Sequence, residues 1–134
     1  MWVFVFIVFL LHSLAEIAFG LRAFITGSFS SQSSDETMHQ PANLAAAARF
    51  LGAALIALGL LGALVLAGPG VGSDMGFWVA VLLAVFHGIG SLGVVATARA
   101  NPGFLRETHA RGALTVHMVL ALGFVMSAIL HNQL

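Results

Sequence analysis

The chain has 134 residues, of which 60% are hydrophobic and only 7% are charged. A soluble domain of this size leaves much of its surface in water and could not hide so much apolar area, so the composition indicates a membrane protein. The formal net charge is zero, with five basic residues, all arginine, against five acidic ones, which excludes the basic surface that nucleic-acid binding requires. Cysteine is absent, which excludes disulfides, thiolate metal sites and a thiol nucleophile.

Four apolar segments predict four membrane-spanning helices, at about residues 2–25, 43–67, 76–98 and 110–132. Each reaches about 20 residues, the length that a helix rising ~1.5 Å per residue needs to cross a ~30 Å hydrocarbon core. Backbone groups in lipid must be satisfied within their own segment, so these segments are expected to be helical. The predicted fold is all-α: an integral, multi-pass membrane four-helix bundle in which residues 1–134 form a single domain.

The connections between the spans carry turn-forming residues. The segment 28–41 is rich in serine and predicts a solvated loop. Gly68-Pro69-Gly70 ends the second helix, and Ser73 or Asp74 is expected to cap the third. Asn101-Pro102-Gly103 is expected to stop the third helix before the fourth begins.

The arginines predict the orientation of the chain. All five lie on or near the side shared by the first and third loops: Arg22, Arg49, Arg99, Arg106 and Arg111. The opposite side, which holds both termini and the second loop, has none. By the positive-inside rule, both termini are expected on the non-cytoplasmic side.

Polar residues inside the predicted spans are the candidate functional residues, because an ionisable group at that depth needs a partner or a role. Counting inward from the span boundaries places Glu16, Arg49 and His117 in one layer, as a buried polar cluster. Glu16 and Arg49 are interpreted as an ion pair that fixes the packing of the first two helices. The alternative is that Glu16 is a proton-titrating carboxylate, which would need its charged form to be disfavoured by burial.

His12 and His87 fall in a second layer, near the middle of the membrane. Two histidines at matched depth on different helices are candidate axial ligands of haem b or part of a metal site. A metal cage could also draw on Glu16 and His117. The other interpretation is a pair of neutral imidazoles that make interhelical hydrogen bonds, and it leads us to predict no cofactor, with haem b or a metal ion as the alternative.

Leu14-Ala15-Glu16-Ile17 in the first span resembles the small multidrug-resistance transporters, in which a carboxylate exchanges protons for a cationic drug. The likeness covers only that span. Arg49 in the second span would repel a cationic substrate.

A second resemblance covers more of the chain. Ala48-Arg49-Phe50-Leu51-Gly52 and Leu83-Ala84-Val85-Phe86-His87 resemble the ergosterol-biosynthesis scaffold family of small four-span proteins, which tether sterol-synthesis enzymes. Gly90-Ser91-Leu92 stands where that family has an acidic residue after the histidine. The resemblance implies structural roles for Arg49 and His87, and an accessory, non-enzymatic role for the chain.

The sequence therefore predicts a small membrane subunit that acts as an accessory or scaffold chain by binding other membrane proteins. Its expected partners are the lipid bilayer and either other membrane proteins or further copies of itself, and not nucleic acid. One alternative is a proton-coupled small-molecule carrier or channel that uses Glu16. The other is a haem- or metal-binding redox subunit that uses His12 and His87.

Overall fold

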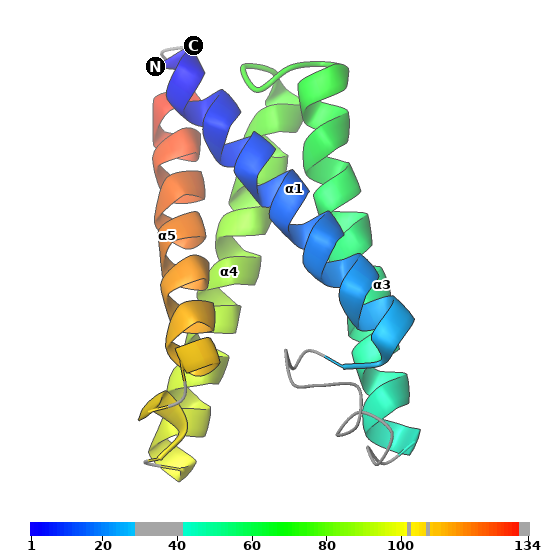
Figure 1. Ribbon diagram of the computed structural model, residues 1–134. Coiled ribbons are helices and arrows are strands. Elements are labelled where there is room, and N and C mark those ends of the chain that lie inside the picture. The colour runs from blue at the N-terminus through cyan, green and yellow to red at the C-terminus, as the bar shows by residue number, and fades with distance from the viewer. Residues whose placement is uncertain (29–41, 102, 107, 132–134) are drawn as a thin grey trace. The chain divides into compact units, whose positions relative to one another are not determined.

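The computed structural model describes residues 1–28, 42–101, 103–106 and 108–131. Its elements are α1 (Trp2–Thr26), α3 (Ala42–Ala67), α4 (Asp74–Ala100), the short 3₁₀ helix η1 (Phe104–Arg106) and α5 (Thr108–Leu130) (Figure 1). The described chain is thus all-helical, which confirms the predicted fold class at that level.

Among the described residues, four helices are long and apolar enough to cross a membrane: Trp2–Thr26, Ala42–Ala67, Asp74–Ala100 and Ala110–Leu130. Their ends differ from the predicted ends of the spans by two residues or fewer. The four predicted spans are therefore confirmed as apolar helices. Almost all of the predicted loop, residues 29–41, lies outside the described residues.

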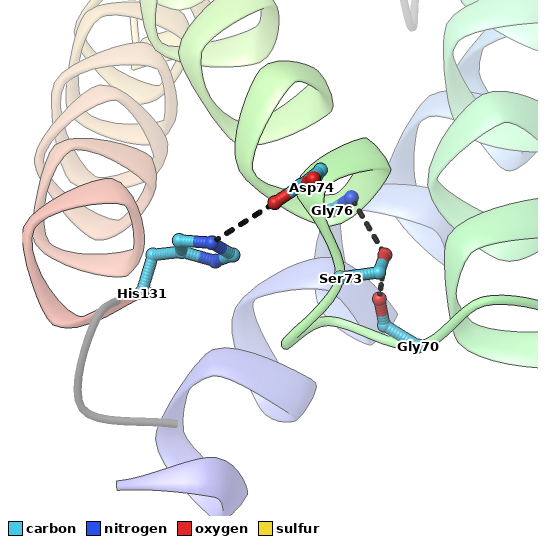
Figure 2. Close-up of polar contacts among 5 residues, drawn as sticks. All are labelled: Gly70, Ser73, Asp74, Gly76 and His131. Carbon is cyan, nitrogen blue, oxygen red and sulfur yellow. Dashed lines mark hydrogen bonds and ion pairs between the residues drawn. The ribbon is translucent and has the colours of Figure 1, made fainter.

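The turn between α3 and α4 follows from its glycines and its serine. Gly70 has a φ of +85°, a left-handed conformation that glycine adopts without steric cost. The Ser73 hydroxyl donates to the Gly70 carbonyl over 2.7 Å and accepts from the Gly76 amide over 3.0 Å (Figure 2). Ser73 is thus the N-cap of α4, as predicted. At the other end of α4, Asn101 is the C-cap, and its amide donates to the Thr97 carbonyl.

The chain divides into two compact units. One comprises residues 9–64, and so most of α1 and α3; the other comprises residues 1–8 and 65–134, and so α4, η1 and α5 with the outer ends of α1 and α3. The prediction of a single domain stays a prediction.

In the unit of residues 9–64, α1 and α3 approach at glycines. A Cβ atom at Gly20 would lie 2.7 Å from the Gly52 carbonyl oxygen, and one at Gly52 would lie 2.7 Å from the Gly20 carbonyl oxygen. A Cβ at Gly59 would meet Ile17 at 2.8 Å. Only glycine fits at such distances, and small residues allow this close packing in membrane proteins. Gly52 and Gly59 of α3 therefore face α1.

In the other unit, α4 and α5 pack along each other. The first residues of α1 belong to this unit: a Cβ at Gly123 of α5 would meet the Val8 side chain at 3.2 Å, and one at Gly72 would overlap the ring of Trp2. His131, at the other terminus, lies 3.8 Å from Asp74 at the start of α4. Both ends of the chain therefore lie at the same end of this unit (Figure 1).

Candidate functional site

A pair of histidines lies between α4 and α5. Nδ1 of His87 and Nδ1 of His117 are 3.0 Å apart, and the ring centroids are separated by 5.3 Å. His87 is fully buried and His117 is partly buried. The two imidazoles are thus hydrogen-bonded to each other, which gives His117 a partner that the sequence analysis did not name.

The surroundings fix both rings. The Phe124 ring lies parallel to the His87 ring, with an interplanar angle of 3° and a centroid distance of 6.0 Å. Phe86 meets both imidazoles edge-on. A Cβ at Gly90 would come within 3.0 Å of His117 ring atoms, so the absence of a side chain there makes room for the imidazole. The pair is therefore held by its neighbours on both helices.

The chemistry of this bond requires two different tautomers. One Nδ1 must carry the hydrogen and donate it, and the other Nδ1 must accept it, so the second neutral ring keeps its proton on Nε2. Two ligand nitrogen atoms on opposite sides of a metal ion lie about 4 Å apart, because each metal–nitrogen bond is about 2.0–2.1 Å long. The observed 3.0 Å suits adjacent positions on one ion, and not the two axial positions of a haem.

His12 and Glu16 form a second pair, on one face of α1 in the unit of residues 9–64. Both side chains are buried, with exposed fractions of 0% and 6%. A ring nitrogen of His12 and a carboxylate oxygen of Glu16 lie within 4.8 Å of each other. Nε2 of His12 also lies 3.4 Å from the Leu58 carbonyl oxygen of α3. The shared helix face expected for residues four apart is thus present.

Arg49 lies elsewhere in the same unit. Its Cζ atom is 3.3 Å from the point where a Gly27 Cβ would stand, just beyond the end of α1. Gly27 is about three helical turns beyond Glu16 along the chain. Side chains lean toward the N-terminus of their own helix. Arg49 lies near the start of α3, so its side chain leans toward Gly27. The Glu16 side chain leans toward the N-terminus of α1, and therefore away from Gly27, because α1 and α3 are antiparallel. The structure therefore does not bring Arg49 beside Glu16.

The residues that the sequence predicts to lie together belong to two different units. His12, Glu16 and Arg49 belong to residues 9–64, whereas His87 and His117 belong to the other unit. The pairing of His12 with His87, and the placement of His117 in a layer with Glu16, stay predictions.

Asp74 and His131 are a polar pair that the sequence analysis did not single out. His131 Nε2 lies 3.8 Å from a carboxylate oxygen of Asp74, whose side chain is fully exposed (Figure 2). The His131 ring also packs against Phe77, at a centroid distance of 5.1 Å. Nothing in the sequence links the two positions, because they are distant in the chain and meet only through the packing of α4 against α5. Because the Asp74 carboxylate is fully exposed, water screens this contact and it contributes little to stability.

Hydroxyl groups inside the helices bond to their own helix. Five of them donate to the carbonyl four residues earlier: Ser13 to Phe9, Thr26 to Arg22, Ser91 to His87, Thr97 to Gly93 and Ser127 to Gly123. Such bonds satisfy a hydroxyl without a partner on another helix.

No family model matches this chain, and neither a curated protein nor a solved structure matches it significantly. The resemblance to the ergosterol-biosynthesis scaffold family therefore stays a prediction.

Proposed function

We propose that the chain is an integral membrane protein with both termini on the non-cytoplasmic side, and that it is an accessory or scaffold subunit that binds other membrane proteins. The observation that supports this proposal is that polar side chains of the helices form hydrogen bonds within the protein. Five hydroxyls bond to their own helices, and His87 bonds to His117. These groups contribute to internal packing, which suits a structural rather than a chemical role.

The outer sides of the helices supply the contact surface in this proposal. Large apolar side chains are exposed along α3 and α5, among them Phe50 at 81%, Leu122 at 62% and Ile129 at 62%. Lipid covers such side chains as readily as protein does, so association between helices depends on close packing and not on hydrophobicity.

Photo-crosslinking in the native membrane tests the proposal. A photoreactive amino acid at Phe50 or Leu122 is expected to give adducts that contain a second membrane protein, because both positions face outward. The matched control is Leu83, which is fully buried and should give no intermolecular adduct. Adducts with copies of this chain alone would replace the scaffold role by a homo-oligomer. A chain that forms no adduct and elutes alone from mild detergent would overturn the proposal.

A metal-binding subunit is the second candidate function, and the convergence of the two Nδ1 atoms of His87 and His117 favours it. Imidazole nitrogen suits late first-row ions such as Zn²⁺, Cu²⁺ and Ni²⁺. Two neutral imidazoles do not offset the charge of a divalent ion inside a membrane, which weighs against this candidate. Metal analysis and an absorption spectrum of the purified protein test it: one equivalent of metal or a Soret band would favour a cofactor role, and neither would remove it.

A further inference from the structure

Three arginines lie where α4 passes into α5, at one end of the unit that holds these helices. Arg99 is in the last turn of α4, Arg106 ends η1, and Arg111 is in the first turn of α5. All three are exposed. In the sequence from Arg99 to Arg111, Glu107 is the only carboxylate, so this segment has a formal charge of +2.

Hydrogen bonds hold the backbone that carries these arginines. The Gly103 amide donates to the Asn101 side chain over 3.2 Å, and the Phe104 amide donates to the Asn101 carbonyl over 2.9 Å. The Arg106 amide then donates to the Gly103 carbonyl over 2.9 Å. Because η1 also contacts both α4 and α5, Arg106 is kept close to the ends of the two helices that carry Arg99 and Arg111.

Apolar side chains border this cationic end. Phe104 and Leu105 precede Arg106 and are half-buried. Along the adjoining helices, Leu92 of α4 and Val119 of α5 are exposed by 69% and 61%. A free anion would use only the charge of this surface, whereas a phospholipid would place its phosphate at the arginines and its acyl chains along the apolar sides.

We propose that Arg99, Arg106 and Arg111 bind the headgroup of an anionic phospholipid. This inference rests on the membrane insertion proposed above but not on the scaffold role. A guanidinium group can donate two parallel hydrogen bonds to a phosphate, which favours arginine at such surfaces. Each arginine that contacts the lipid headgroup is expected to contribute a binding preference of about fivefold, which is the size of the effect of one basic residue at an anionic membrane surface.

Native mass spectrometry of the purified protein tests the proposal. The protein is equilibrated with equal amounts of phosphatidylglycerol and phosphatidylcholine that carry the same acyl chains. The wild type is expected to retain phosphatidylglycerol preferentially. The double variant Arg99→Gln with Arg111→Gln should lower that preference about 25-fold, or fivefold for each arginine. The single variant Arg106→Gln should lower it about fivefold.

The matched control removes the same charge from the other unit, by Arg22→Gln with Arg49→Gln. This variant should keep the lipid preference within about twofold. Equal losses in the two double variants would mean that net charge alone attracts the lipid, and would overturn the proposal. A wild type without preference would also overturn it. Displacement of the lipid by millimolar inorganic phosphate would identify a site for free anions instead. Lipid binding is measured in the absence of any protein partner. A failure of the lipid proposal therefore leaves the scaffold role standing, and a failure of the scaffold role leaves the lipid proposal standing.

Discussion

At the scale of single residues, the His87–His117 contact is the best-defined polar feature inside the spans. Hydrogen bonds between helices in membranes contribute about 0.6 kcal/mol on average and up to about 1.7 kcal/mol, because the unfolded state also finds partners for these groups. Removing one partner costs more than this, since the other is left buried without that bond. Changing one member of the pair is therefore expected to cost more than the hydrogen bond itself contributes.

We expect His87→Leu and His117→Leu each to lower the free energy of unfolding by about 1–3 kcal/mol. The double variant should cost less than the sum, by about 0.6–1.7 kcal/mol, because the two rings share one bond. Unfolding in mixed micelles, followed by circular dichroism, measures all three. As a control, His117→Leu combined with His131→Leu should be additive, since His131 contacts Asp74 and Phe77 instead. Additive costs for the His87–His117 double variant would show that the rings do not interact.

Glu16 separates the scaffold role from a proton-coupled carrier. In proteoliposomes that enclose a pH-sensitive dye, we expect the wild type to pass no protons beyond the leak of empty liposomes. Glu16→Gln keeps the size of the side chain and removes its titratable carboxyl group, so it should give the same trace. A wild-type flux that Glu16→Gln abolishes, with helix content unchanged, would replace the scaffold role by a carrier.

At the scale of elements, the contact between α1 and α3 depends on backbone approach. A Cβ at Gly52 would lie 2.7 Å from the Gly20 carbonyl oxygen and 2.7 Å from the Phe24 amide nitrogen. Backbone atoms cannot move aside as a flexible side chain does, so the helices would have to separate.

We therefore expect Gly52→Ala to lower the free energy of unfolding by about 1–3 kcal/mol, as overpacking of a close contact does. The matched control is Gly93→Ala in α4, where nothing lies within 4 Å of the added Cβ. That substitution should be neutral or should stabilise the protein by up to about 1 kcal/mol, because alanine favours helix over glycine. Chemical unfolding of both variants measures these changes in the free energy of unfolding. Equal changes in the two variants would contradict the close approach of α1 and α3.

At the scale of the whole molecule, the topology across the membrane is open to a direct test because the chain has no cysteine. Met75 and Ala100 are exposed and lie near opposite ends of α4. We expect a membrane-impermeant maleimide to label Met75→Cys in intact cells, since the arginine distribution predicts that this end lies outside the cytoplasm. Ala100→Cys should react only after the membrane is permeabilised. The reverse pattern would invert the proposed orientation.

Much of the secondary structure could be predicted from the sequence. The predicted ends of the spans lie within two residues of the helix ends, because the length of an apolar segment and its bounding Gly, Pro and Ser residues are local properties. The shared face of His12 and Glu16 also followed from helical spacing alone.

The contacts between helices were decided by the tertiary structure. Counting depth along each span placed Arg49 level with Glu16, but side-chain direction carries Arg49 to Gly27. Depth counting likewise could not select His87 as the partner of His117, because that contact depends on which faces of α4 and α5 meet. Local sequence is enough to predict which segments are helices and where they turn, since lipid and backbone geometry act on each segment alone. Which polar groups meet depends on rotation and close packing between helices, and those are properties of pairs of elements.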